Sequence, residues 1–364
     1  MYPFFRRYLF AMDPERAHQF TLGLLRLAGA VAPARWMLEL LYSAPARPVT
    51  VFGLTFRNPI GLAAGYDKDG IAVRGLAALG FGHIEVGTVT PLPQPGNPQP
   101  RLFRLVEDEA LINRLGFPSR GSAYVQRRLD PGRRGHSLRE MIGARHPVAP
   151  GTSKRSLRHA AGCVIGVNIG RNKSTPNERA AFDYLELLQN FAPHADYLTV
   201  NVSSPNTPEL RELQKRGPLE ELLGELHAQR HFEQQEIKRR LRLLVKLDPD
   251  LSRSQLAEAV DVSLRTHMDG IIVTNTTLSR EGVRSPLSRE EGGLSGPPLR
   301  ARSEAALQRV LEQVSGEVPV VSAGGISNAD DVKRRLDMGA ALVQVYTGLV
   351  YRGPGLVKNL LRAF

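Results

Sequence analysis

The segments VPVVSAGG (318–325) and ALVQVYTG (341–348) each run through several apolar residues and end in glycine or a small polar residue. Near-continuous apolar runs are typical of parallel strands buried on both faces. Apolar residues at helical spacing, such as Leu219, Leu222 and Leu226, lie in most of the gaps between such runs. Strand–helix alternation repeated eight times predicts an α/β fold, a parallel (β/α)8 TIM barrel. The six earlier runs are IGLAAG (60–65), HIEVGTVT (83–90), CVIGVNIG (163–170), YLTVNVSSP (197–205), LRLLVKLDP (241–249) and GIIVTNTT (270–277).

The chain before the barrel has a different pattern. Residues 1–45 are expected to form two short helices, with Asp13 capping the second and Pro14 in its first turn. Such a helix either packs on its own domain or lies in a membrane interface, and the pattern leaves both open. We therefore assign residues 1–45 to a small helical extension and residues 46–364 to the barrel. Apolar residues recur in the second helix at spacings of three and four, at Ala17, Phe20, Leu24, Leu27 and Val31.

Composition limits the classes of protein to which the chain can belong. Its 364 residues are 42% hydrophobic and 23% charged, which is globular composition. Cys163 is the single cysteine, which excludes intrachain disulfides and multi-cysteine zinc sites, and no metal site is expected. No apolar run reaches 18 residues, so no membrane-spanning helix is expected. The net charge of +12 favours an anionic partner: nucleic acid, acidic lipid or a phosphorylated ligand.

Small or polar residues stand where most of the predicted strands end. Because barrel active sites lie at the carboxyl ends of the strands, these residues predict a functional ring. The loops after the last two strands commonly bind phosphate in this fold. The chain has no Walker loop and no GxGxxG motif, so the phosphate is expected on a mononucleotide-like cofactor or a substrate. The ring consists of Gly65, Asp67, Lys68, Thr88, Asn168, Asn201, Ser203, Ser204, Lys246, Thr274, Asn275, Thr276, Gly324, Gly325, Tyr346 and Thr347.

Lys246 stands within the apolar run LLVKLDP and leaves a choice of chemistry. A lysine that points into a barrel either forms a Schiff base with a carbonyl substrate, as in an aldolase, or supports an anionic ligand by its charge. Ser204 lacks the GxSxG context of a hydrolase, so a serine hydrolase is not favoured. A basic module without enzymatic activity, binding nucleic acid or membrane, is a further alternative.

Ten motifs, in order along almost the whole chain, resemble dihydroorotate dehydrogenase. The resemblance is to the membrane-associated, quinone-linked class, class 2. Taken together the motifs are highly specific, although single pieces such as SAGGI occur in many flavin and phosphate barrels. They are LFAMDPERAH (9–18), NPIGLAAGYDKDG (58–70), EVGTVTPLPQPGNPQPRLFRL (85–105), INRLGF (112–117), GVNIGRNK (166–173), VNVSSPNTP (200–208), DGIIVTNTT (269–277), GGLSG (292–296), SAGGI (322–326) and GAALVQVYTGLVYRGP (339–354).

The resemblance implies an oxidoreductase of de novo pyrimidine (UMP) biosynthesis that oxidises (S)-dihydroorotate to orotate. One FMN per subunit would accept the hydride, and a membrane quinone would be the final electron acceptor. Ser204 matches the catalytic base; soluble relatives have cysteine there, so serine favours the quinone-linked class. Residues implied in FMN binding are Ala64, Gly65, Tyr66, Asp67, Lys68, Thr88, Asn168, Asn201, Lys246, Thr274, Gly296, Gly325, Tyr346 and Thr347. Residues implied in substrate binding are Lys68, Asn113, Arg114, Leu115, Gly116, Phe117, Asn201, Asn206, Asn275 and Thr276.

The resemblance also gives residues 1–45 a role. In this class the N-terminal helices form an apolar funnel through which quinone reaches FMN, and His18, Arg101 and Tyr346 match positions near that tunnel. The resemblance therefore favours peripheral association with the cytoplasmic side of a cell membrane, an anionic lipid surface as partner, and no nucleic acid. The lack of a transit peptide favours a bacterial inner membrane, and a monomer is expected.

The segment of residues 127–160 departs from the family pattern. It is longer and more basic than in a typical member, with nine Lys or Arg residues against Asp130 and Glu140. It is expected to be a solvated insertion or an added contact to anionic lipid. The connection 91–162, which contains this insertion, is too long for a simple βα unit and is expected to carry extra structure over the top of the barrel.

Overall fold

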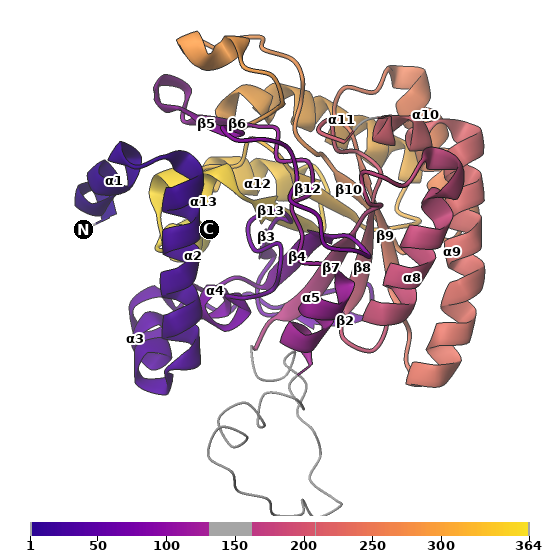
Figure 1. Cartoon of the computed structure of the whole chain (residues 1–364), viewed down its shortest axis with the longest axis horizontal. Coiled ribbons are helices and arrows are strands. Elements are labelled where there is room, and N and C mark those ends of the chain that lie inside the picture. Colours follow the sequence, from indigo (N-terminus) through magenta and orange to yellow (C-terminus); the bar gives the residue numbers. More distant parts are fainter. Residues whose placement is uncertain (1, 131–161, 208, 363–364) are drawn as a thin grey trace, which may run out of the picture.

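The computed structural model describes residues 2–130, 162–207 and 209–362. Its centre is a closed barrel of parallel strands covered on the outside by helices (Figure 1). Each barrel strand lies within one of the eight segments predicted from the sequence, so the (β/α)8 barrel is confirmed. In barrel order the strands are β3 (Ile60–Leu62), β4 (His83–Val89), β7 (Val164–Ile169), β8 (Tyr197–Asn201), β9 (Arg242–Leu247), β10 (Gly270–Val273), β12 (Val320–Ala323) and β13 (Leu342–Val345).

Most of the outer helices bury apolar residues against the barrel. In α9 (Arg216–Ile237), Leu219, Leu222 and Leu226 are buried at the spacing that the sequence predicted. Capping boxes begin two helices, α10 (Arg253–Arg265) at Ser252 and α12 (Ala329–Asp337) at Asn328, because each side chain accepts a hydrogen bond from a backbone N–H that the first turn leaves unpaired. The remaining helices around the barrel are α4 (Val73–Ala78), α5 (Ser122–Leu129), α8 (Ala180–Phe191), α11 (Arg300–Val314), α13 (Thr347–Arg352) and α14 (Leu356–Arg362).

A short hairpin closes the amino-terminal end of the barrel. It consists of β1 (Val49–Val51) and β2 (Leu54–Phe56), paired antiparallel. Its Phe52 and Phe56 belong to one buried cluster with Leu244 and Ile272, which point inward from β9 and β10. Because this end is filled by apolar side chains, a ligand pocket inside the barrel must open at the other end.

Two large side chains, His83 and Tyr197, lie above this hairpin inside the barrel. Phe56 contacts the His83 ring edge-to-face, with ring centroids 5.5 Å apart. Glycines on the neighbouring strands make room for both rings. A Cβ atom on Gly61 would lie 2.0 Å from the His83 ring, and one on Gly166 would lie 2.2 Å from the Tyr197 ring. A side chain at either glycine would therefore clash with the ring of His83 or Tyr197 inside the barrel.

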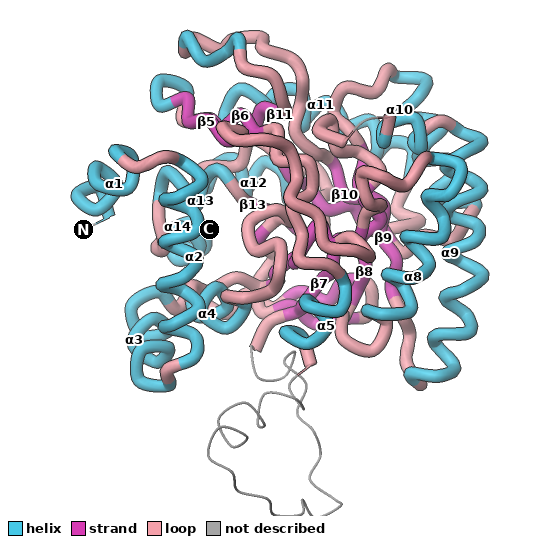
Figure 2. The backbone as a smooth tube through the Cα atoms, in the orientation of Figure 1, coloured by secondary structure: helices cyan, strands magenta, loops and turns pink. Residues whose placement is uncertain are grey.

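A second, smaller sheet covers part of the carboxyl end of the barrel. Its antiparallel strands are β5 (Leu102–Leu105), β6 (Ala110–Asn113) and β11 (Gly293–Ser295). The backbone tube shows them apart from the barrel strands (Figure 2). The expectation of extra structure between residues 91 and 162 is confirmed by β5, β6 and α5. Most of the basic insertion, residues 131–161, lies outside the described residues.

The N-terminal extension forms three helices, not the expected two. They are α1 (Tyr2–Ala11), α2 (Pro14–Ala30) and α3 (Ala32–Tyr42), which stand beside the barrel (Figure 1). Asp13 caps α2 as expected, since its side chain accepts a hydrogen bond from the backbone N–H of Arg16. The chain leaves the helix at Val31, whose backbone is extended, and a proline at the start of α3 follows. The sequence prediction missed this break.

The apolar stripe predicted in α2 is only partly covered. Phe20, Leu24 and Leu27 are 51%, 51% and 63% exposed. The buried residues of the helix are Ala17, Leu22 and Gly29, of which Gly29 lies directly against the backbone of α4. Gly29 allows close packing of the two helices, Leu22 packs into the core, and Phe20, Leu24 and Leu27 stay largely exposed.

No helix in the described part of the chain is both long enough and apolar enough to cross a membrane.

We predict that Gly166→Ala destabilises the protein by about 1–3 kcal/mol, because the new methyl group would overlap the Tyr197 ring. Gly224→Ala in α9 is the matched control. Nothing lies within 4 Å of the place its new methyl group would occupy, and alanine favours a helix interior over glycine by up to about 1 kcal/mol. Urea denaturation of both variants measures the difference. A Gly166→Ala variant as stable as the wild type would contradict the close packing at Tyr197.

Candidate active site

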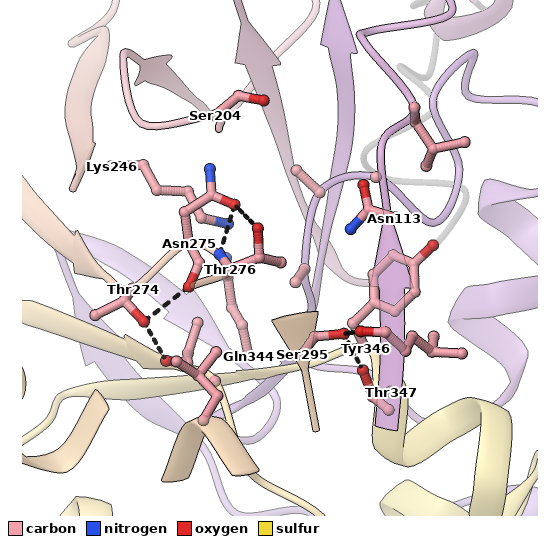
Figure 3. Close-up of a pocket in the computed structure, with 18 of the residues that line it drawn as sticks. Asn113, Ser204, Lys246, Thr274, Asn275, Thr276, Ser295, Gln344, Tyr346 and Thr347 are labelled. Carbon is pink, nitrogen blue, oxygen red and sulfur yellow. Dashed lines mark hydrogen bonds between the residues drawn. The ribbon is translucent and has the colours of Figure 1, made fainter. Parts of the chain in front are cut away.

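A pocket opens at the carboxyl ends of the barrel strands, where the sequence predicted a functional ring. Ser204, Lys246 and Asn275 project into it from one side, and Asn113 and Tyr346 from the other (Figure 3). The small sheet contributes Asn113 and closes the top. Sequence-predicted residues that line the pocket are Ala64, Gly65, Lys68, Thr88, Asn113, Leu115, Gly116, Phe117, Asn201, Ser204, Asn206, Lys246, Thr274, Asn275, Thr276, Gly296, Gly325, Tyr346 and Thr347.

Amide and hydroxyl groups at the pocket form one hydrogen-bonded network. The Thr88 hydroxyl donates to Asn168 Oδ1 over 2.6 Å, and Asn201 Nδ2 donates to the same oxygen over 3.0 Å. A register shift between Val86 and Val89 occurs where Thr88 leaves the regular strand pattern, and such irregularities re-aim side chains. Asn275 Nδ2 donates to the Ser203 hydroxyl over 3.0 Å. These bonds fix the orientation of the side chains before any ligand binds.

A second group of polar contacts lies under the small sheet. Asn206 Nδ2 donates to Asn113 Oδ1 over 3.0 Å, which joins the loop after β8 to the end of β6. The backbone N–H of Asn206 donates to the Ser204 hydroxyl over 3.3 Å. Ser204 is 5% exposed, and this exposed part faces the pocket. The loop after β8 therefore presents one hydroxyl and one amide to the same space.

Two lysines place positive charge at the pocket. Lys246 is 5% exposed, and its ammonium makes no hydrogen bond to another described residue. Burial lowers the pKa of Lys246, while the negative charge of Glu85 opposes that effect. Lys68 donates to the carbonyl oxygen of Gly65 over 2.7 Å. Burial lowers the pKa of Lys68 to about 8, against the opposing charges of Glu15 and Asp69.

The pocket wall formed after β12 and β13 suits an anionic group. Gly324 and Gly325 have φ angles of +102° and +74°, a left-handed conformation that glycine adopts without strain. A Cβ atom on Gly325 would lie 2.4 Å from Arg300 Cα, so only glycine fits there. The Thr347 hydroxyl donates to the Ser295 hydroxyl over 2.8 Å. Exposed backbone of this kind can approach a phosphate closely. Together with the unpaired Lys246 ammonium, it fits the phosphorylated flavin that the sequence resemblance implies.

A separate apolar cavity of about 660 Å³ lies between the N-terminal helices and the barrel. Phe20, Leu24 and Leu25 of α2 line it, as does His18. Burial, together with the charge of Lys68, lowers the pKa of His18 to about 4, so this side chain is neutral at pH 7. Three residues, Leu102, Leu111 and Tyr346, line both the cavity and the polar pocket. The two spaces therefore share a wall.

The comparisons with known proteins agree with one another. The family model described as dihydroorotate dehydrogenase matches residues 47–364. The chain belongs to the dihydroorotate dehydrogenase family. A dihydroorotate dehydrogenase (quinone) of Halorhodospira halophila is 45% identical over 364 residues, covering 100% of this chain and 97% of the relative. One from an Anaeromyxobacter species is 47% identical over 361 residues, covering 99% and 91%.

Solved structures give the same result for the fold. The crystal structure of ligand-free DHODH from Eimeria tenella is 38% identical, with a TM-score of 0.80, and the match covers 96% of this chain and 93% of that one. The complex of the same organism's DHODH with ferulenol is 36% identical, with a TM-score of 0.79 and coverages of 96% and 90%. The resemblance stated from the sequence motifs is thus confirmed.

Four residues that the resemblance to dihydroorotate dehydrogenase assigned to ligands lie off the pocket wall. Tyr66 faces the apolar cavity, with its ring 4.9 Å from that of His18. The Asp67 carboxylate accepts backbone N–H groups of the following turn, and burial raises its pKa to about 6. Arg114 forms an ion pair with Glu290 over 2.7 Å. The fourth, Asn168, lies below Thr88 and Asn201 and supports both.

The structure adds pocket residues that the dihydroorotate dehydrogenase motifs did not single out. Gln344 of β13 lines the pocket beside Tyr346, and Ser295 of β11 lines it beside Thr347. Gln344 was detectable, because a polar residue between Val343 and Val345 on a buried strand points inward with Tyr346. Ser295 stands within the motif GGLSG, but its direction was not predictable, because its short strand gave no periodic pattern.

Arg101, assigned to the quinone tunnel, does not line the apolar cavity but ties α2 to the barrel. Its Nη2 lies 2.7 Å from Glu15 Oε1, and the two side chains are 10% and 13% exposed. Its Nη1 donates to the carbonyl oxygens of Pro95 and Asn97, each over 2.7 Å. Burial alone would raise the pKa of Glu15, but the hydrogen bonds and charge of Arg101 hold it below 4.5.

We predict that Arg101→Met loosens α2 by about 3 kcal/mol, since it leaves the Glu15 carboxylate without its buried partner. Hydrogen–deuterium exchange over residues 14–30 measures the change. Lys333→Met removes an exposed ion pair with Asp337 and should alter stability by less than about 1 kcal/mol. In the wild type, the contribution of Glu15 to folding stability should be complete above pH 4.5. It should be lost as the pH falls through the pKa of Glu15 in the folded protein, which is lower than 4.5. Equal exchange in all three proteins would contradict the anchoring role.

Proposed function

We propose that this chain oxidises dihydroorotate to orotate with FMN as hydride acceptor and passes the electrons to a membrane quinone. One observation carries the proposal: a polar, cationic pocket and a largely apolar cavity share the wall formed by Leu102, Leu111 and Tyr346. A polar substrate and an apolar electron acceptor thereby have separate spaces on either side of one wall. Family membership and the names of the relatives at 45–47% identity support the same reaction.

The pocket residues fit FMN at two ends. Lys246, Thr88 and Asn201 offer a charge and hydrogen-bonding groups toward the flavin ring, and the backbone at Gly325 and Thr347 accommodates the phosphate. When bound, FMN supplies a two-electron acceptor for the C6 hydride of dihydroorotate. The buried positive charge of Lys246 favours added electron density near it, which is the usual way in which a protein tunes a cofactor.

The substrate groups are expected beneath the small sheet. The Lys68 ammonium suits the carboxylate of dihydroorotate, and its charge is present below about pH 8. Asn113, Asn206 and Asn275 each offer both a donor and an acceptor, which suits ring N–H and C=O groups. Because the asparagines are already held by hydrogen bonds, binding orders few additional side chains.

Ser204 is the proposed base that removes the C5 proton. Its hydroxyl faces the pocket and accepts one backbone hydrogen bond, from Asn206. A hydroxyl is a weak base at neutral pH, so the proton has to pass onward. The hydroxyl of Thr207 is buried and finds no hydrogen-bond partner among the described residues, which makes it a candidate for that relay.

The N-terminal helices are proposed to lie in the surface of a membrane and to deliver quinone to the apolar cavity. Phe4, Tyr8 and Trp36 are 61%, 63% and 65% exposed, although large apolar groups in contact with water are unfavourable. Leu24 and Phe20 extend from this exposed surface into the cavity lining. The location proposed is the cytoplasmic side of a bacterial inner membrane, with residues 1–45 as the membrane-associating segment and residues 46–364 as the catalytic domain.

Ser204→Ala should keep FMN and bind orotate, but flavin bleaching by dihydroorotate in stopped flow should slow roughly 100-fold or more. Ser204→Cys should recover part of the rate, more so at high pH as the thiolate forms. Ser203→Ala is the neighbouring control: it removes the bond to Asn275 and should weaken orotate binding more than it slows the reaction. Near-normal bleaching in Ser204→Ala would remove this residue from its proposed role.

Substitutions at two leucines on α2 can distinguish the delivery of quinone from membrane binding. Leu24 lines the cavity, whereas Leu27 is 63% exposed and does not. Leu24→Glu should lower turnover with a short-chain quinone at least about tenfold, because a charge in the apolar cavity disfavours quinone there. Leu27→Glu should weaken vesicle binding and leave that turnover unchanged. Both should still bleach with dihydroorotate in one turnover. Equal quinone turnover in the two variants would contradict the proposed tunnel.

A further inference from the structure

Glu85 lies inside the barrel below the pocket, and the proposed reaction does not use it. It projects inward from β4 and is fully buried. Its Oε1 accepts a hydrogen bond from Asn168 Nδ2 over 2.8 Å. Its Oε2 accepts two, from Gln344 Nε2 over 2.9 Å and from the Tyr197 hydroxyl over 3.2 Å. A carboxylate buried at this depth is costly unless it is paired, so its retention calls for a reason.

A carboxylate differs from an amide because it only accepts hydrogen bonds. Both amides beside Glu85 must therefore turn their NH2 groups toward it, and their oxygens are forced to point elsewhere. The oxygen of Gln344 has no partner among the described residues and belongs to a side chain that lines the pocket. Glu85 thus decides which way the amide of this pocket-lining residue faces, and it leaves the Gln344 oxygen buried without a partner among the described residues.

The same constraint passes through Asn168 to the pocket. With its NH2 held by Glu85, Asn168 Oδ1 is left to accept from both the Thr88 hydroxyl and Asn201 Nδ2. Asn201 Oδ1 then faces upward, where it accepts from the Ser203 hydroxyl over 3.1 Å. Each amide in this series has one allowed orientation as long as the first acceptor cannot donate.

Glu85 also acts on Lys246 by charge. No direct ion pair joins these two described residues, but the negative charge raises the pKa of Lys246 against the lowering effect of burial. Among the described residues, Glu85 is the charged group that raises the pKa of Lys246. The negative charge of Glu85 therefore favours the cationic form of the lysine that faces the pocket without a hydrogen-bond partner among the described residues.

We propose that Glu85 is a positioning residue: from below the pocket it sets the orientation of the Asn168 and Gln344 amides and balances the charge of Lys246. The proposal rests on the proposed function, since the flavin is the ligand for which Glu85 orients these side chains. It requires that the effects of Glu85 reach the pocket through these three side chains and not through general loss of packing.

The first experiment needs no flavin, so it is independent of the proposed function. The pKa of Lys246 is measured by NMR in apoprotein carrying 13Cε-labelled lysine, with the signal assigned by its loss in Lys246→Arg. Glu85→Gln, which keeps the shape of the side chain, should lower that pKa by about 1 pH unit or more. Tyr197→Phe is the matched control: it removes one hydrogen bond to the same carboxylate, keeps the charge, and should leave the pKa of Lys246 unchanged.

The second experiment tests the amide series by a double-mutant cycle on FMN affinity. Glu85→Gln should raise the Kd of the apoprotein for FMN by roughly tenfold, and in an Asn168→Ala background the same change should raise it by less than about threefold. Glu85→Asp covers the case in which the glutamine variant fails to fold: it keeps the charge but withdraws the oxygens, so the pKa of Lys246 should hold while FMN affinity falls. An unchanged pKa of Lys246 in Glu85→Gln, or an additive cycle, would overturn the proposal.

Discussion

The closed barrel imposes one constraint on which the rest of the structure depends: an inward-pointing polar group has to find its partner inside. Apolar side chains and the Phe52–Phe56 hairpin fill the amino-terminal end. Above them the interior changes to polar groups, anchored on the fully buried Glu85. Since the strands are buried on both faces, these groups have no solvent to turn to. The orientation of the pocket side chains is thus decided below the pocket.

The strands were predictable because their signal is local. A buried parallel strand has to be apolar along its length, and eight such runs in order leave few folds to choose from. Directions of single side chains were less predictable. Tyr66 and Asp67 adjoin the pocket residues Gly65 and Lys68 in sequence, yet one faces the apolar cavity and the other accepts backbone N–H groups. Neighbours in a tight turn diverge, and sequence adjacency does not reveal where each one points.

The N-terminal helices show a related limit. Apolar residues spaced three and four positions apart identify the apolar face of a helix, but they do not show what packs against that face. In α2 the large Leu22 packs into the core, and Gly29 lets the helix approach α4 closely. Phe20 and Leu27, which belong to the predicted apolar face, are largely exposed. The break at Val31 was hidden because an apolar residue continues the stripe while its backbone leaves the helix.

The shared wall explains why one chain can serve two ligands of opposite polarity. A polar ligand entering an apolar cavity would lose its hydrogen bonds with water and gain none. A long apolar ligand in the other pocket would cover the lysine and amide groups without offering them a hydrogen bond. Each space therefore excludes the wrong ligand by solvation alone. Tyr346 suits the boundary because its ring contacts Tyr66 on the apolar side, while burial raises the pKa of its hydroxyl to about 12 and keeps the group neutral. A neutral wall adds no charge that either ligand would have to overcome.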